Sequence, residues 1–344
     1  MKYGCAHTNG LYNYPDDGNQ FANGCDAIWD MGCRTLKVYC TSDYLTNYPE
    51  QAAWSSTPTN LTQLAQTTQF ATQLARGWDT IIMTCFTFAN GSTNWWRVEA
   101  TNAKLAAEYT EIYNLAVHLL TSYNNSGTKF VLQNWEGDWA YMDAFDPDTF
   151  VDRKYTEFYA AFAAVRQKAV HDAMRNTAHK NVSVRMAFEI NRVLDTKSAP
   201  ARVRIINTLA KRFTPDIVSY SWYEATDAVP GWSSQGDFEA LVETQMREWD
   251  ALVQLAWPGV TRACGEFGYP ENQIVAEFPQ LDVGDMINKV ASVSVDLGLE
   301  YLVYWQCFDN EASIPYTYRG YWFVKPDGSQ SLAGAAFEAL ASGG

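Results

Sequence analysis

The 344-residue sequence lacks several features that mark common classes of protein. It has no stretch of 18 consecutive apolar residues, so it offers no membrane-spanning helix. The first ten residues lack the charged start and apolar core of a signal peptide, and we expect a secreted protein whose leader has been removed. Basic residues are few, because 25 Lys and Arg stand against 39 Asp and Glu, a formal net charge of −14. Such a chain repels nucleic acids and anionic membranes, so neither is an expected partner.

Motifs for cofactors and metals are also missing. The sequence contains neither GxGxxG nor GxxxxGK[ST], the loops that bind dinucleotides and phosphates. Its four His form no HExxH motif and no close cluster, which argues against a catalytic metal centre. We therefore expect no metal and no cofactor. The seven Cys form no CxxC motif and are interpreted as small buried hydrophobes, with only a pair between Cys25 and Cys33 left open.

Aromatic residues, by contrast, are abundant. They make up 15% of the chain and include 13 Trp and 20 Tyr. Flat rings with one polar edge suit surfaces that bind rigid ligands with apolar faces, and sugars are such ligands. A well-packed aromatic core explains the same composition equally well.

Strand-like and helix-like patterns alternate along the chain. The expected strands are 2–7, 35–40, 79–88, 129–135, 182–190, 216–223, 261–268 and 299–308. The expected helices include 60–78, 102–123, 146–174, 201–213, 237–257, 283–298 and a last helix within 324–340. Several strands are apolar on both faces, which is typical of a parallel sheet covered by helices. Eight such units predict an α/β fold, a single (β/α)8 TIM barrel that spans residues 1–344 as one domain, and we expect a monomer.

Active sites of such barrels lie at the carboxyl ends of the strands. Polar and aromatic residues occur at nearly every predicted strand end: His7, Asn9, Lys37, Tyr39, Asn134, Trp135, Glu136, Asp138, Glu189, Asn191, Tyr223, Glu224, Glu266, Trp305 and Asp309.

Two glutamates among them suggest a chemistry. Glu136 lies between Trp135 and Trp139 in "VLQNWEGDWAYM", and Glu266 ends the seventh strand. Glycoside hydrolysis needs one carboxylic acid to protonate the leaving oxygen and one carboxylate to attack or to activate water. Carboxylates across a narrow cleft push their pKa values apart, and tryptophan walls favour the protonated form. Alternatively, Glu136 is a solvated loop residue and Glu266 is paired for stability with a buried cation such as Lys37.

This pattern resembles clan A of the glycoside hydrolases, the retaining (β/α)8-barrel enzymes. "QNWEGD" is similar to the clan's acid/base segment on strand four, and "CGEFG" to its nucleophile segment on strand seven. "GCRTLKVY" resembles the segment of strand two, "SWYE" offers Tyr223 on strand six, and "VYWQCFD" offers Trp305 on strand eight.

The resemblance implies a hydrolase that cleaves a β-linked oligo- or polysaccharide with net retention. It implies Glu266 as the nucleophile, Glu136 as the acid/base and Tyr223 as the residue that orients Glu266. The sequence departs from the clan at two places. Trp135 stands between Asn134 and Glu136, where the clan has Asn directly before the acid/base, and Lys37 replaces an Arg, whose bidentate contacts Lys cannot make.

The remaining candidates are assigned to substrate binding. Trp135, Trp139 and Trp305 are expected to stack on sugar rings, and Asn134, Lys37, Glu189, Asn191 and His7 to contact the substrate, although His7 fits a core position equally well. Asp138 is expected on a solvated face at a helix start. Two alternatives stay open: an inverting glycosidase that pairs Glu136 with Glu189 or Asp138, and a carbohydrate-binding barrel without catalysis. The sugar and its linkage are not defined by the sequence.

Overall fold

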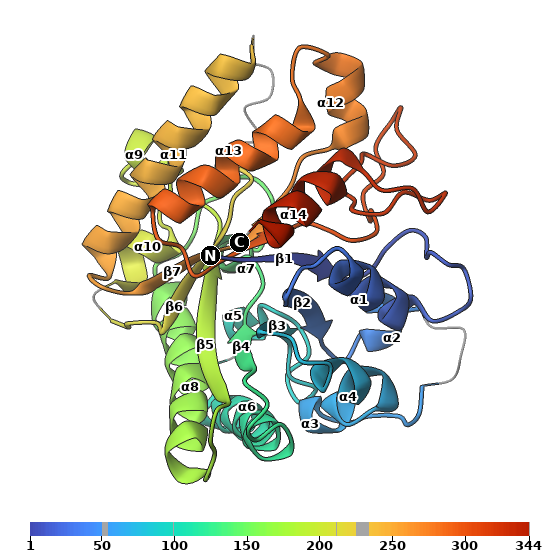
Figure 1. Ribbon diagram of the computed structural model, residues 1–344. Helices are drawn as coiled ribbons and strands as arrows, with labels where there is room; N and C mark the ends of the chain where they lie inside the picture. Colours follow the sequence, from blue (N-terminus) through green and yellow to red (C-terminus); the bar gives the residue numbers. More distant parts are fainter. Residues whose placement is uncertain (50–53, 99, 211, 225–233, 344) are drawn as a thin grey trace.

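The computed structural model describes residues 1–49, 54–98, 100–210, 212–224 and 234–343 (Figure 1). Its eight strands pair in parallel in the order of the sequence, and β8 closes on β1. The strands are β1 Lys2–His7, β2 Thr35–Cys40, β3 Thr80–Cys85, β4 Lys129–Gln133, β5 Ser183–Ile190, β6 Ile217–Ser221, β7 Thr261–Phe267 and β8 Tyr301–Tyr304. The predicted (β/α)8 barrel is confirmed.

Alternating side chains explain why these strands form a closed barrel. In β3, Ile81 and Met83 belong to the large core between strands and helices, whereas Ile82 belongs to a second core inside the barrel. Both faces of the strand are therefore buried, as expected for a parallel sheet. The inner core is filled by Ala6, Ile82, Val131, Ala187, Ile217, Ala263, Tyr301, Val303, Trp305 and Tyr321.

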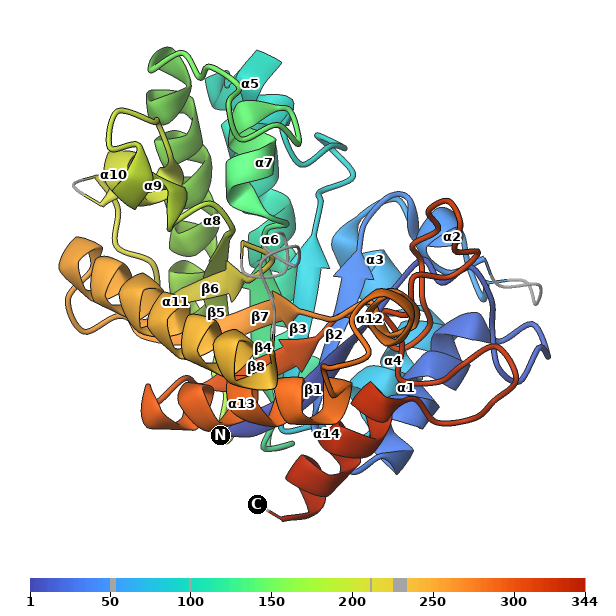
Figure 2. The same cartoon turned by 90° about the horizontal axis from the view of Figure 1, so that it is seen from above.

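Helices cover the outside of the barrel. They are α1 Gln20–Asp30, α2 Tyr44–Asn47, α3 Leu61–Ala65, α4 Thr68–Leu74, α5 Trp95–Val98, α6 Asn102–Ser122, α7 Gly137–Met142, α8 Lys154–Asn176, α9 Asp195–Ser198, α10 Ile205–Leu209, α11 Gln235–Ala256, α12 Glu271–Glu277, α13 Val283–Asp296 and α14 Leu332–Ser342. The long helices α6 and α8 pack against each other, as do α11 and α13 (Figures 1 and 2). Within the described residues, no helix combines the length and apolar character needed to cross a bilayer.

The predicted helix 60–78 is wrong, because the structure has two short helices there. Asn60 caps the first, α3, by accepting a hydrogen bond from the backbone N–H of Gln63. Thr67 caps the second, α4, by accepting one from the backbone N–H of Phe70. A Thr side chain that serves as an N-cap starts a new helix and separates it from the previous one.

Two other helix boundaries also differ from the prediction. The predicted helix 146–174 starts only at Lys154, as α8, and the predicted helix 201–213 is reduced to the short α10. The buried guanidinium of Arg204 donates hydrogen bonds to the carbonyl of Pro147, at 2.5 Å, and to the carboxylate of Asp195, at 2.8 Å. These contacts hold both segments in irregular conformations that local propensity does not predict.

The cysteines are buried and Cys33 is a free thiol, so the pair with Cys25 that the sequence left open does not form. Among the described residues, no group of three His, Cys, Asp or Glu is arranged to hold a metal ion.

Candidate active site

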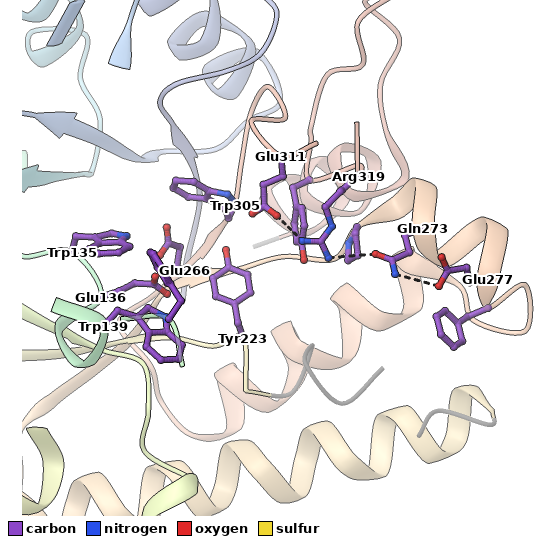
Figure 3. Close-up of a pocket in the computed structure, with 14 residues that line it drawn as sticks. Trp135, Glu136, Trp139, Tyr223, Glu266, Gln273, Glu277, Trp305, Glu311 and Arg319 are labelled. Carbon is purple, nitrogen blue, oxygen red and sulfur yellow. Dashed lines mark hydrogen bonds and ion pairs between the residues drawn. The ribbon is translucent and has the colours of Figure 1, made fainter. Parts of the chain in front are cut away.

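A cavity of about 540 Å³ opens at the carboxyl ends of the strands (Figure 3). Six of the predicted site residues line it: Trp135, Glu136, Trp139, Tyr223, Glu266 and Trp305. The other lining residues are Phe145, Pro270, Gln273, Glu277, Phe278, Glu311, Arg319 and Tyr321. The structure thus brings both candidate glutamates and the predicted aromatic residues to one cavity.

Glu136 stands at the junction between β4 and the short helix α7. The strand ends at Gln133, and Glu136 occupies the position before the first residue of α7. Trp135 and Trp139 flank the glutamate, and the ring of Phe145 lies 6.0 and 5.9 Å from theirs, centroid to centroid. The three rings form an aromatic wall beside the carboxyl group.

Asp138 anchors this junction, and its predicted place on a solvated face is wrong. Its carboxylate is fully buried and accepts hydrogen bonds from the backbone N–H groups of Asn191, Arg192 and Ile205 at 2.9–3.1 Å. Asn191 and Arg192 directly follow β5, and Ile205 is the first residue of α10. Asp138 therefore fixes the loop that carries Glu136.

Replacing Asp138 by Ala should destabilise the protein by about 3 kcal/mol or more, because three buried backbone donors lose a charged acceptor. Denaturant unfolding monitored by circular dichroism measures this change. Asp146→Ala, in the same region of the chain, removes an exposed carboxylate that accepts a hydrogen bond from the backbone N–H of Asp148, and should cost under about 1 kcal/mol. Equal small effects of both variants would contradict the anchoring role.

Glu266 lies near the end of β7, directly after Gly265. A Cβ atom at Gly265 would lie 2.0 Å from Oγ of Ser219 and 2.9 Å from Oε1 of Glu189. Only glycine fits where the strand approaches these side chains so closely. The small residue before Glu266 in "CGEFG" is thus required by packing.

Lys37 supplies the positive charge beneath Glu266. Its Nζ atom donates to Oε1 of Glu189 at 2.9 Å and to the carbonyl of Gly265 at 3.1 Å, and lies 3.7 Å from Oε1 of Glu266. Its side chain is fully buried. The lysine therefore compensates buried carboxylates on two strands.

A single hydroxyl group lies between the two candidate catalytic glutamates. Oγ of Ser221 is 2.5 Å from Oε1 of Glu136 and 3.0 Å from Oε2 of Glu266. The nearest oxygens of the two carboxyl groups therefore cannot be farther apart than the sum of these two distances. Carboxyl separations of about 5–5.5 Å are typical of retaining glycosidases, and about 6.5–9.5 Å of inverting ones.

The surroundings of the two glutamates shift their pKa values. Burial raises the pKa of Glu136 well above its usual value, and the negative charge of Glu266 raises it further. Burial also raises the pKa of Glu266, to about 8, although the ammonium group of Lys37 acts to lower it. Because the ammonium group of Lys37 lies 3.7 Å from Glu266, a single proton on the pair is held by Glu136, and Glu266 is then the ionised partner. Such a pair can provide a general acid and a nucleophile in one site.

Several predicted substrate contacts lie beneath the cavity and do not line it. Glu189 is fully buried, and its carboxylate accepts from Lys37, from Nε2 of Gln133 at 2.8 Å and from the backbone N–H of Glu136 at 3.2 Å. Lys37 is enclosed by the same group of residues. The structure places both as supports for the two glutamates in the cavity, and not as residues that face a substrate.

The side chains of Asn134 and Asn191 form hydrogen bonds with backbone groups. The amide of Asn134 bridges β4 and β5, since it donates to the carbonyl and accepts from the N–H of Glu189 at 3.1 and 3.0 Å. Oδ1 of Asn191 accepts from the N–H of Asp138 at 3.0 Å. Neither side chain lines the cavity.

His7 is a core residue, the second of its two interpretations. It is 1% exposed, and its Nε2 atom lies 2.9 Å from the carbonyl of Gln20. Burial lowers the pKa of His7 to about 4, so the ring is neutral at pH 7. A Cβ atom at Gly24 would lie within 2.5 Å of the ring, which shows how closely helix α1 packs on it.

Sequence reasoning missed the polar wall opposite the tryptophans. Arg319 donates to Oε2 of Glu311 at 2.7 Å and to Oε1 of Gln273 at 3.3 Å, and Gln273 donates to Glu277 at 3.2 Å (Figure 3). These residues come from α12 and from the loop after β8. Since none lies at a strand end, the barrel rule gave no signal for them.

Sequence and structure comparisons place this geometry among known folds. No family model and no curated protein sequence matches the chain. Among solved structures, a GH5_18 protein from Bifidobacterium longum subsp. infantis is similar, with a TM-score of 0.63, 16% identity and coverage of 100% of this chain and 79% of that one. A GH5_18 protein from Streptomyces cattleya in complex with Manβ1-4GlcNAc has a TM-score of 0.65 and 13% identity, covering 99% and 80%.

The likeness extends to a chain of matching length. The hyperthermostable endo-1,4-β-D-mannanase from Thermotoga petrophila has a TM-score of 0.58 and 12% identity, and the match covers 99% of both chains. At these identities the likeness concerns the fold. The chain shares the (β/α)8 fold of these solved structures, the fold class that the sequence resemblance implied.

Proposed function

We propose that the protein is a retaining glycoside hydrolase that cleaves a β-linked oligo- or polysaccharide. The observation that carries this proposal is the contact of two buried carboxyl groups, on β7 and at the end of β4, with one hydroxyl group between them at the base of an aromatic cavity. Their closeness favours a double displacement, since an inverting enzyme needs room for a water molecule between its carboxyl groups.

In the first step, Glu266 attacks the anomeric carbon while Glu136 gives its proton to the leaving oxygen. This step forms a covalent bond between the sugar and the carboxylate of Glu266. In the second step, Glu136 takes a proton from water, and the water oxygen displaces Glu266 from the anomeric carbon. Each displacement inverts the configuration, so the product retains that of the substrate.

The inverting alternative with Glu189 has less support. Both carboxylate oxygens of Glu189 accept hydrogen bonds from protein donors, and the side chain is fully buried. A base that activates water has to contact that water. Asp138 is engaged in the same way by backbone N–H groups.

β-Mannosides are the first substrates to test, because one structural neighbour binds Manβ1-4GlcNAc and another is an endo-1,4-β-D-mannanase. The assay offers aryl β-glycosides, Manβ1-4GlcNAc and β-1,4-mannan oligosaccharides, and follows the anomeric protons of fresh product by NMR. Initial release of the β-anomer supports retention. Initial release of the α-anomer would show inversion, and binding without turnover would show a carbohydrate-binding barrel.

The role of Glu136 as the acid is tested separately, by comparing substrates with different leaving groups. Glu136→Gln should lower kcat/KM for a natural disaccharide by about 10²–10⁴-fold, because the leaving oxygen then departs without a proton. An aryl glycoside whose phenolate leaves readily should lose far less in the first step. The ratio of the two losses measures acid assistance, and equal losses for both substrates would contradict it.

A further inference from the structure

We propose that Ser221 is a positioning residue that serves both catalytic glutamates in turn, through one hydroxyl group that rotates between them. This inference rests on the proposed function and deepens it. Ser221 was not among the residues expected from the sequence. Its role follows from where β6 places it and from the single proton that it carries.

A bulge between β6 and β7 brings Ser221 to the level of Glu266. Tyr220 pairs with Cys264, whereas Ser221 pairs with Glu266, so Gly265 is the extra residue. Without this shift, Ser221 would lie opposite Gly265. β-Bulges commonly redirect a side chain beside an active site. Here the bulge aligns a fully buried hydroxyl group with both carboxyl groups.

The hydroxyl group has one proton to donate and lies within hydrogen-bonding distance of two carboxyl groups. It cannot donate to both at once. With Glu136 protonated and Glu266 ionised, Glu136 donates to Oγ of Ser221, and Ser221 donates to Glu266. This arrangement satisfies each atom and holds the shared proton on Glu136, where the first step needs it.

In the covalent intermediate, the glutamate that needs a hydrogen-bond donor is Glu136 and no longer Glu266. Glu136 has then lost its proton to the leaving group, and the carboxylate of Glu266 is part of an ester and carries no charge. The hydroxyl group of Ser221 rotates and donates to the ionised Glu136. No proton passes through the serine, since only its own O–H bond changes direction. One side chain thus stabilises the ionised partner in both steps.

A substitution of Ser221 leaves the other ionisable side chains around the two glutamates in the protein. The ionisable side chains that act on the two carboxyl groups are Lys37 and Tyr39 from β2, Glu189 from β5, Tyr223 after β6, Cys264 from β7 and Glu311 from the loop after β8. A shift on removal of the hydroxyl group can therefore be attributed to Ser221.

The test compares pH profiles of kcat/KM for the wild type, Ser221→Ala and Ser221→Thr. Ser221 stabilises ionised Glu266 and protonated Glu136, so Ser221→Ala should move the acidic limb up and the alkaline limb down, each by about one pH unit. Ser221→Thr keeps a hydroxyl group and should restore both limbs. Ser219→Ala removes another buried hydroxyl group two positions earlier on the same strand and should leave both limbs in place.

A uniform loss of rate with unmoved limbs in Ser221→Ala would overturn the proposal, since it would show a role in packing alone. A second measurement does not depend on turnover. In protein with ¹³C-labelled glutamate carboxyl groups, the titrations of Glu136 and Glu266, assigned with single Gln variants, should lie closer together in Ser221→Ala than in the wild type. An unchanged separation would overturn the role of Ser221 even if the wild type hydrolyses no glycoside, a result that would refute only the proposed function.

Discussion

Glu266→Gln should abolish turnover, with kcat/KM reduced by at least about 10⁴-fold on every substrate. The amide cannot form the covalent intermediate, so aryl glycosides lose as much activity as natural disaccharides. This behaviour distinguishes Glu266 from Glu136, whose loss depends on the leaving group. The variant should fold normally, because Gln preserves the shape of the side chain.

The direct measurement is the trapping of the intermediate. A fluorinated aryl glycoside that forms a slowly hydrolysed glycosyl ester should add one sugar to the intact wild-type protein, as seen by mass spectrometry. Peptide mapping should place the added sugar on Glu266. Glu338→Gln, which changes an exposed carboxylate on α14, is the matched control and should be labelled like the wild type. A sugar on Glu189 or Asp138 would refute the assignment of the nucleophile.

The barrel could be predicted because its signal is repeated along the chain. Strands such as β3 are apolar on both faces, and alternation with helices leaves few topologies open. The helix limits could not be predicted in the same way. The start of α8 and the shortness of α10 depend on Arg204, which contacts the carbonyl of Pro147, 57 positions earlier, and the carboxylate of Asp195.

The strand-end rule located Glu136, Glu266, Tyr223 and Trp305, since all of them line one cavity. The rule did not indicate how far below the cavity each side chain lies inside the barrel. Lys37 and Glu189 also project into the barrel, yet they lie beneath the cavity, where they bind each other. Depth depends on strand register and tilt, which one sequence does not define. The position of Ser221 could have been inferred from the sequence. It lies two positions before Tyr223, and side chains two apart on a strand point to the same face.

Lys37→Met should destabilise the protein by about 3–5 kcal/mol near pH 7. The change keeps much of the side-chain volume but leaves Glu189 and Glu266 buried without a cation. Lys129→Met is the matched control, because Lys129 forms an exposed ion pair with Glu300 and should contribute under about 1 kcal/mol. Denaturant unfolding of the three proteins measures the difference.

The sign of the pH dependence makes this prediction specific. The pKa of Glu266 is about 8 in the wild type, with the ammonium group of Lys37 acting to lower it. Without that group the pKa rises further, so the folded variant keeps a proton that the folded wild type releases as the pH rises through about 8. The deficit of Lys37→Met relative to the wild type should therefore be nearly constant below about pH 7 and grow as the pH rises through about 8. For the same reason, the acidic limb of any activity that remains should move to higher pH. A deficit that is independent of pH would mean that Lys37 acts through its packing and not through its charge on Glu266.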